Sequence, residues 1–187
     1  MRNTKYFLLI MITFLSFFNL NGETYTENFD VTDNWSGGAG YTTRSYTNSS
    51  APGGLSFISN DVYREGSNTY SGSYAWRLDD DEGAYLNAEM SLTVQSFSIQ
   101  MARWDNSPSP NVSIEYSTDG GSNYSQIGTI DGSYFTGGDR AYKAYEHTFA
   151  SPISPDAGST IIIRFYTISG ERMYYDDFSI VYSTEQI

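Results

Sequence analysis

The sequence predicts an all-β protein, an antiparallel β-sandwich, and three observations support this fold class. Apolar residues alternate with polar ones along most of the chain, which is the period of a strand with one buried face. Turn signals such as Pro52-Gly53-Gly54 and Asp119-Gly120-Gly121 separate the alternating runs. Tyr, Ser, Gly, Thr and Asn are abundant, a composition that favours strands and turns. Many short strands between regular turns are typical of a sandwich.

The alternation is clearest in segments 96–101, 112–117, 161–166 and 178–182. A shift of phase between Val94 and Phe97 predicts a β-bulge there. The segment Glu82–Val94 is the one place where a short helix fits the pattern. The chain shows neither an internal repeat nor a linker, so we expect a single domain. Further strands are expected at Thr24–Asp30, Tyr41–Tyr46, Leu55–Ser59, Ser73–Leu78, Tyr124–Ile130 and Ala144–Phe149.

Residues 1–22 have the layout of a secretory signal peptide. Arg2 and Lys5 give a positive start, Tyr6–Phe18 is an almost unbroken apolar run, and the small Gly22 precedes the expected cleavage point. The apolar run is too short for a membrane span. We therefore expect the protein to be secreted or held at the cell surface, without stable membrane insertion, with residues 23–187 forming the sandwich domain.

Charge and cysteine usage exclude several classes of function. The whole chain carries a net charge of −12, and loss of the two positive charges at Arg2 and Lys5 leaves −14. Such a field repels phosphate backbones, so nucleic acid is excluded as a partner. Because the chain has no cysteine, it has neither a disulfide nor a thiolate metal site.

Two acidic segments stand near the ends of the mature chain, Glu27-Asn28-Phe29-Asp30 and Tyr175-Asp176-Asp177-Phe178. The first and last strands of an antiparallel sandwich often lie side by side, and carboxylates that meet there would repel one another unless a cation lay between them. Calcium prefers carboxylate and carbonyl oxygens. We therefore predict a structural Ca²⁺ with Glu27, Asp30, Asp176 and Asp177 as candidate ligands. Alternation directs Asp176 and Asp177 to opposite faces unless a bulge intervenes, and a solvated acidic edge is the alternative.

Together with the strand Gly72-Ser73-Tyr74-Ala75-Trp76-Arg77-Leu78, these two segments resemble the jelly-roll domains that include many carbohydrate-binding modules and the MAM-type extracellular domains. The resemblance implies a jelly-roll sandwich from a secreted bacterial protein. It also implies calcium ligation by Glu27 and by Asp176 or Asp177. MAM domains carry cysteines, and this chain has none, which favours the carbohydrate-binding branch.

The segment Ser117-Thr118-Asp119-Gly120-Gly121-Ser122-Asn123-Tyr124 resembles an Asp-box, the hairpin motif of sialidase-like proteins. Asp119 can accept hydrogen bonds from turn amides, and the glycines permit positive φ. A single copy indicates a well-formed hairpin and does not imply sialidase activity.

Sugar rings stack on aromatic side chains while polar neighbours bond to their hydroxyls. Trp104 and Asn106 end a strand before a proline-containing loop, Trp35 precedes Gly37-Gly38, and Trp76 lies within a strand. These four residues are the candidate ligand contacts. The alternative is that the aromatic residues fill the core, as they often do in sandwiches.

Catalysis is not expected. His147 is the only histidine, and the chain holds neither a Gly-x-Ser-x-Gly nor a His-Glu-x-x-His motif. Glu115 or Glu146 could serve as a glycosidase carboxylate, but the strand motif of sandwich glycosidases is absent. The sequence therefore predicts a non-catalytic binding module whose partner is a glycan or cell-surface polymer. The alternative is a structural or adhesion domain, or an accessory module of a larger surface protein or secreted hydrolase.

Overall fold

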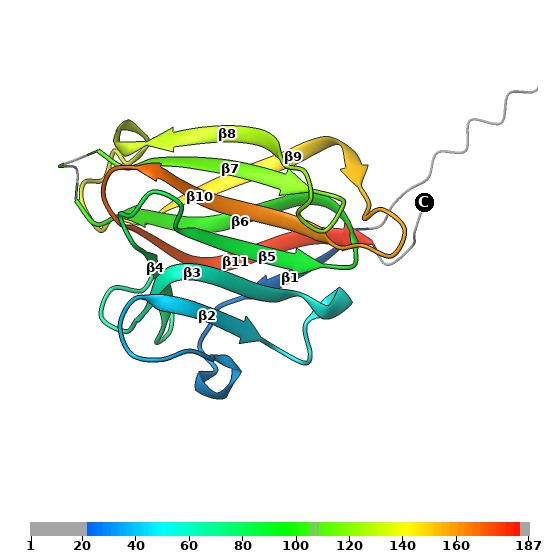
Figure 1. Cartoon of the computed structure of the whole chain (residues 1–187), viewed down its shortest axis with the longest axis horizontal. Coiled ribbons are helices and arrows are strands. Elements are labelled where there is room, and N and C mark those ends of the chain that lie inside the picture. The colour runs from blue at the N-terminus through cyan, green and yellow to red at the C-terminus, as the bar shows by residue number, and fades with distance from the viewer. Residues whose placement is uncertain (1–21, 106, 108, 184–187) are drawn as a thin grey trace, which may run out of the picture.

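A computed structural model of the chain describes residues 22–105, 107 and 109–183. Within them, eleven strands form one antiparallel sheet that curls into a β-sandwich (Figure 1), which confirms the predicted all-β jelly-roll class. The expected signal peptide, apart from Gly22, lies outside the described residues, and so does Asn106. No helix in the described part of the chain has the length and apolar character needed to cross a membrane.

Short 3₁₀ turns cover Thr32–Asn34, Pro52–Gly54 and Gly132–Tyr134. The strands are β1 (Glu23–Glu27), β2 (Thr42–Thr47), β3 (Ser56–Glu65), β4 (Ala75–Leu78), β5 (Tyr85–Met90), β6 (Thr93–Arg103), β7 (Asn111–Ser117), β8 (Ser125–Asp131), β9 (Lys143–Ile153), β10 (Ile161–Ser169) and β11 (Met173–Ser183).

Strand β3 belongs to both layers of the sandwich. Its residues 56–60 pair with β5, and its residues 62–65 pair with β4. Between them Asp61 has a positive φ of 51°, so the strand bends where it changes layer. The front layer of Figure 1 contains β8, β7, β10, β5 and the first part of β3. The back layer contains the second part of β3 with β4, β11, β6 and β9, and β1 lies beside β11.

The core lies where the apolar faces of the two layers meet. One end of it is aromatic, with the Phe29 ring 4.7 Å from that of Phe57 and 5.8 Å from that of Trp76, both edge to face. Tyr46 contacts Phe29 in the same way at 5.3 Å. Such pairs are worth about 0.5–1.5 kcal/mol each beyond the area they bury. This cluster therefore fixes the segment that follows β1 against the sheet.

Two local expectations have different outcomes. The pairing of β6 with β9 shifts register between Val94 and Ser96, which confirms the predicted bulge. A helix within Glu82–Val94 is wrong, because β5 occupies Tyr85–Met90. β5 is hydrogen-bonded to β3 on one side and to β10 on the other. The two sets of ladder bonds override the weak local preference of the segment.

The two ends of the described chain are neighbouring strands, as predicted. β1 pairs antiparallel with β11 from Glu23 opposite Tyr182 to Glu27 opposite Phe178. This pairing brings the two acidic segments close together.

The Asp-box-like segment forms the turn of the β7–β8 hairpin. Asp119 accepts hydrogen bonds from the Asn123 backbone N–H (2.9 Å), the Asn123 side-chain amide (2.6 Å) and the Ser117 hydroxyl (2.6 Å). These hydrogen bonds, of which that from the Ser117 hydroxyl has the largest effect, hold the pKa of Asp119 well below its ordinary value. The segment therefore closes the turn, as expected.

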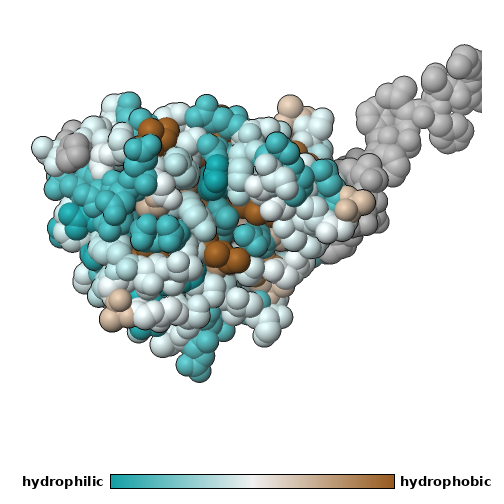
Figure 2. All heavy atoms as spheres, in the orientation of Figure 1, coloured by the Kyte–Doolittle hydropathy of each residue, from teal (hydrophilic) through white to brown (hydrophobic). Residues whose placement is uncertain are grey.

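The outer face of the front layer is mostly polar, with isolated apolar spots (Figure 2). Arg164 of β10 lies opposite Glu115 of β7 and donates a hydrogen bond to it from Nε at 2.9 Å. Glu146 belongs to β9 in the back layer. The two carboxylates considered for a glycosidase thus lie in different layers.

Candidate functional site

Trp76 is a core residue, which corrects its prediction as a ligand contact. It is 0% exposed, and its ring lies 4.3 Å from that of Trp35. Its indole N–H is buried and has no hydrogen-bond partner among the described residues. The alternation of β4 turns Trp76 toward the core and the next residue, Arg77, toward the outer face.

Trp35 lines a hollow of about 470 Å³ at the edge of the sandwich, which we call the Trp35 pocket. β2 stops pairing with β3 at Thr42 opposite Val62, so the next residues of β3 extend past the end of β2. The glycine-rich loop 36–40 lies beside this uncovered stretch. The lining residues are Trp35, Ser36, Gly37, Gly38, Ala39, Gly40, Arg44, Tyr63 and Arg64.

One wall of the pocket is rigid. The Trp35 indole N–H donates to the Phe29 carbonyl at 2.7 Å. The buried Arg44 donates from Nε to the Val62 carbonyl at 3.2 Å and from Nη2 to the carbonyls of Gly38 and Gly40. Burial lowers the pKa of Arg44. These bonds hold the loop and the indole in place before any ligand arrives.

Gly37 is required at its place in this loop. Its φ is +102°, and a Cβ there would lie 2.9 Å from the Thr43 carbonyl oxygen.

Arg64 supplies further hydrogen-bond donors to the pocket. Its guanidinium carbon lies 5.9 Å from the centre of the Trp35 ring and 4.6 Å from that of Tyr74. None of the ion pairs among the described residues includes Arg64. Sequence reasoning missed this residue, because an arginine that follows a tyrosine in an alternating strand has no distinguishing pattern.

Trp104 follows the end of β6 and is surrounded by arginines. The guanidinium carbons of Arg140, Arg77 and Arg172 lie 4.2, 4.9 and 4.9 Å from the centre of its ring. Tyr174 stacks on it with the ring centres 5.8 Å apart. We call these five residues the Trp104 cluster. A ligand here would meet guanidinium groups as well as the indole.

The pocket and the cluster share a neighbour. Tyr63 lines the Trp35 pocket, and the guanidinium carbon of Arg77 lies 4.5 Å from the centre of its ring. Tyr63 and Tyr174 both stand opposite Arg77, on the two strands that flank β4. Tyr63 is therefore the residue that the two features have in common. Trp35 packs on the core-facing Trp76, whereas Trp104 contacts the outward-facing Arg77, so the two indoles contact opposite faces of β4.

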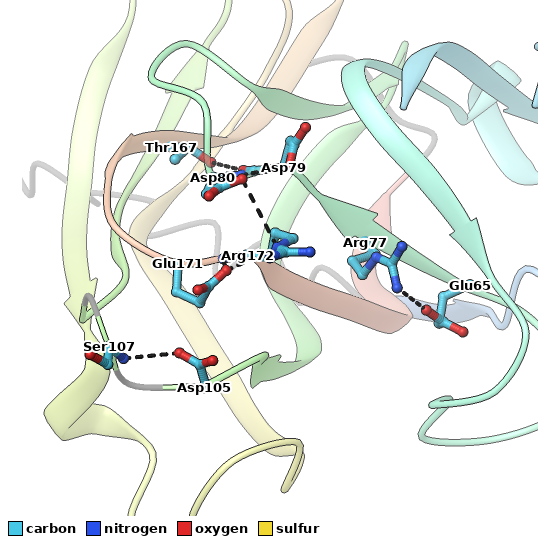
Figure 3. A network of polar contacts seen from close by, with 9 residues as sticks. All are labelled: Glu65, Arg77, Asp79, Asp80, Asp105, Ser107, Thr167, Glu171 and Arg172. Atoms are coloured by element: carbon cyan, nitrogen blue, oxygen red, sulfur yellow. Dashed lines mark hydrogen bonds and ion pairs between the residues drawn. The ribbon is translucent and has the colours of Figure 1, made fainter. Parts of the chain in front are cut away.

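Two of the three arginines have carboxylate partners (Figure 3). Arg77 donates from Nη1 to Glu65 at 2.6 Å, and Arg172 donates from Nε to Glu171 at 2.9 Å. Asp80 lies 4.0 Å from Nε of Arg172. The pKa of Asp79 is raised to about 6, mainly by burial and next by the neighbouring Asp80 side chain.

Glu27 is held by protein donors. It is 3% exposed, and its carboxylate accepts four hydrogen bonds, two on each oxygen. The donors are the Tyr46 hydroxyl (2.8 Å), the Phe29 N–H (3.3 Å), the Tyr25 hydroxyl (2.6 Å) and the Asn48 side-chain amide (2.9 Å). Because a carboxylate offers about four acceptor positions, Glu27 is fully satisfied. This finding corrects its prediction as a calcium ligand.

The other three carboxylates all contact the segment 70–74. Asp176 accepts from the N–H groups of Tyr70 (2.8 Å) and Ser71 (3.2 Å), and Asp177 accepts from the Ser71 hydroxyl at 2.7 Å. Asp30 accepts from the N–H groups of Ser73 and Tyr74. Together they hold the segment against β11, within whose span Asp176 and Asp177 lie.

A bulge explains why two adjacent aspartates reach the same residue. The pairing of β11 with β6 shifts register between Asp176 and Ser179, and Asp177 has a φ of +40°. A bulge therefore interrupts the alternation that would direct Asp176 and Asp177 to opposite faces. Asp176 is 0% exposed, and this burial raises its pKa to about 7.

The described residues do not contain a ready-made metal site. No three His, Cys, Asp or Glu side chains among them are arranged to hold an ion. None of the ion pairs of the described chain includes Asp30, Asp176 or Asp177, so no basic side chain neutralises them. The three aspartates are gathered, but each accepts bonds from the backbone or a hydroxyl.

His147 packs among aromatic rings. Its ring lies 4.7 Å from that of Phe149 and 5.8 Å from that of Phe97, and burial lowers its pKa. It also lines a smaller hollow of about 210 Å³, whose other walls are mainly Ser and Thr side chains of β1, β6, β9 and β11.

Comparison with known proteins supports the fold. No protein-family model and no curated protein matches the chain. Among solved structures, the CBM22-1 xylan-binding domain of Paenibacillus barcinonensis Xyn10C is 11% identical with a TM-score of 0.54, over 88% of this chain and 97% of that one. The C-terminal family 22 carbohydrate-binding module of Clostridium thermocellum Xyn10B is 14% identical with a TM-score of 0.50, over 87% and 95%. The chain has the jelly-roll fold of such modules.

A third similar structure comes from another class of protein. The K2 cleaved adhesin domain of Lys-gingipain is 10% identical with a TM-score of 0.52, over 84% of this chain and 99% of that one. At such identities the likeness concerns the fold alone.

Proposed function

We propose that this protein is a secreted, non-catalytic carbohydrate-binding module that holds a glycan in the Trp35 pocket. The observation that carries the proposal is a preformed hollow of about 470 Å³ that combines an indole with an arginine that has no carboxylate partner within residues 22–105, 107 and 109–183. Its volume lies within the range of about 300–1,000 Å³ that is usual for ligand sites.

The chemistry of the pocket suits a sugar. The apolar face of a pyranose ring packs against an indole, while its hydroxyl oxygens accept hydrogen bonds from guanidinium N–H groups. Arg64 offers such groups near Trp35, and Arg44 holds the glycine loop in place. The jelly-roll fold that the chain shares with xylan-binding domains supports a glycan partner.

Replacing Arg64 with alanine is expected to weaken glycan binding about 10-fold, because a charged hydrogen-bond donor is worth roughly 1.5–3 kcal/mol. Arg64 is chosen over Trp35 because the indole also packs on Trp76 and would disturb the core. Affinity electrophoresis against neutral polysaccharides that include xylan, followed by calorimetry with the best binder, measures the effect.

Lys143→Ala is the matched control. Lys143 lies 3.9 Å from the centre of the Tyr134 ring and is not part of the pocket lining, so its loss removes a cation stacked on an aromatic ring elsewhere. Equal affinities for wild type and Arg64→Ala would remove the Trp35 pocket from the site. Failure of the wild-type protein to bind any glycan of the panel would contradict the proposed function itself.

We also propose that calcium stabilises the module through Asp30, Asp176 and Asp177. Three carboxylates that contact one short segment, and that form no ion pair with a basic side chain of the described chain, favour a cation. Glu27 is not included, because its acceptor positions are filled.

Adding calcium to chelator-treated protein is expected to raise its melting temperature, since an ion that binds the folded state alone stabilises it. Scanning calorimetry measures the shift, and Asp177→Asn is expected to diminish it. The matched control is Asp131→Asn, which changes an exposed carboxylate that accepts its bonds from Ser133. Identical melting temperatures with calcium and with chelator would refute this proposal.

An adhesion role is the second candidate, and the similarity in fold to the K2 adhesin domain favours it. Binding to a protein-coated surface that persists in the Arg64→Ala variant would support adhesion over glycan binding.

A further inference from the structure

We infer that the Trp104 cluster binds an anionic substituent of a glycan, a carboxylate or a sulfate. This inference rests on the proposed glycan-binding function and names the class of glycan, an acidic polysaccharide. Its basis is the gathering of three guanidinium groups on one indole in a protein whose overall charge is strongly negative.

Arg140 is the first group that points to an anion. It is exposed, its guanidinium carbon lies 4.2 Å from the centre of the Trp104 ring, and no ion pair of the described chain includes it. Its φ of +58° is unusual for a residue with a Cβ, and its N–H donates to the Arg103 carbonyl at 2.8 Å. The fold therefore accepts a strained backbone at the residue that carries this unpaired positive charge.

Arg77 is the second. Its Nη1 is bonded to Glu65, which fixes the plane of the guanidinium group. Its Nε–H is buried and has no acceptor among the described residues. A buried donor without a partner costs about 1–3 kcal/mol, so an acceptor that enters the cluster would recover this loss.

Arg172 completes the cluster. Glu171 and Asp80 approach its Nε at 2.9 and 4.0 Å. The partners of Arg77 and Arg172 thus hold two guanidinium groups in position, while Arg140 has no carboxylate partner in the part of the chain that the structure describes. Arginine presents a planar set of N–H donors that matches the oxygens of a carboxylate or a sulfate.

An anion fits this place better than the uncharged face of a sugar. Three guanidinium groups and Tyr174 already lie close to the Trp104 ring. Tyr63 lines the Trp35 pocket and also contacts Arg77, so it is the residue that the pocket and the cluster have in common.

Calorimetry with four probes tests the inference: an oligogalacturonate, its methyl ester, a sulfated galacto-oligosaccharide and an uncharged xylo-oligosaccharide. The wild-type protein is expected to bind one or both acidic probes at least about 10-fold more tightly than the methyl ester. Arg140→Gln is expected to lose most of that preference and to keep the affinity for the uncharged probe. The two acidic arms show which anion is preferred.

Lys143→Gln removes the same charge away from the cluster and is expected to retain the preference. Failure of both acidic probes to bind more tightly than the methyl ester, or an unchanged preference in Arg140→Gln, would each overturn the inference. Arg64→Ala separates this result from the proposed function. If Arg64→Ala still weakens binding of the uncharged probe while Arg140→Gln leaves the affinity for every probe unchanged, the proposed glycan binding stands and the anion site does not.

Discussion

Replacing Trp76 with alanine is expected to lower the free energy of unfolding by about 3–5 kcal/mol, the usual cost of removing a large aromatic side chain from a core. Trp76 is fully buried and contacts Phe29, Trp35 and Phe57. Its loss leaves a cavity at the aromatic end of the sandwich, which the rigid β-strands around it cannot close. Urea unfolding followed by fluorescence and circular dichroism measures the change.

Trp76→Phe is the matched variant. It keeps most of the apolar volume and removes an indole N–H that has no partner among the described residues, so no hydrogen bond is lost. Trp76→Phe is expected to lower the free energy of unfolding by less than half as much as Trp76→Ala. A fully stable Trp76→Ala protein that no longer binds glycans would show that the residue serves the ligand and not the core.

Replacing Glu27 with leucine is expected to lower the free energy of unfolding by about 3 kcal/mol or more. The change removes the acceptor of four hydrogen bonds. The donors, which include the buried hydroxyl of Tyr46, then lose this acceptor. Burial is the main cause that raises the pKa of Tyr46 to about 12, and the hydrogen bond to Glu27 raises it further. This hydroxyl therefore stays a donor at all ordinary pH values. Chemical denaturation measures the loss.

The control for this prediction is Glu23→Leu, which removes a carboxylate at the exposed start of the same strand. Glu23 accepts one bond, from the Tyr182 hydroxyl, and its removal is expected to cost below about 1 kcal/mol. The loss caused by Glu27→Leu is expected to be the same with calcium and with chelator. A loss seen only with calcium would return Glu27 to the set of metal ligands.

The fold could be predicted because its determinants are local and repeated. Alternation marked the strands, glycine-rich turns separated them, and the acidic segments at both ends indicated that β1 and β11 are neighbours. β5 could not be predicted in the same way, because its conformation comes from two partners that lie far from it in sequence. The bend of β3 at Asp61 was equally hidden, since it depends on the change of layer.

The site was predicted only in part, for a physical reason. Aromatic residues are easily found in a sequence, but the sequence does not show which of them are buried. Burial distinguishes Trp76 in the core from Trp35 at a pocket, and it depends on the whole fold. Arg64 and Arg140 look like ordinary surface cations until the sheet places each beside an indole. The four hydrogen bonds to Glu27 come from three side chains and one backbone N–H spread over residues 25–48, and no short motif reveals them.

The pairing of β1 with β11 also determines how the domain would respond to force. Since Glu23 lies opposite Tyr182, a tether that pulled on both ends would separate the two strands from one end, like a zipper. The hydrogen-bonded pairs would break in succession instead of sharing the load. As a link between two anchored objects, the domain would therefore yield at low tension, and Glu27, at the far end of the pairing, would be the last residue of β1 to separate, leaving Tyr46 and Asn48.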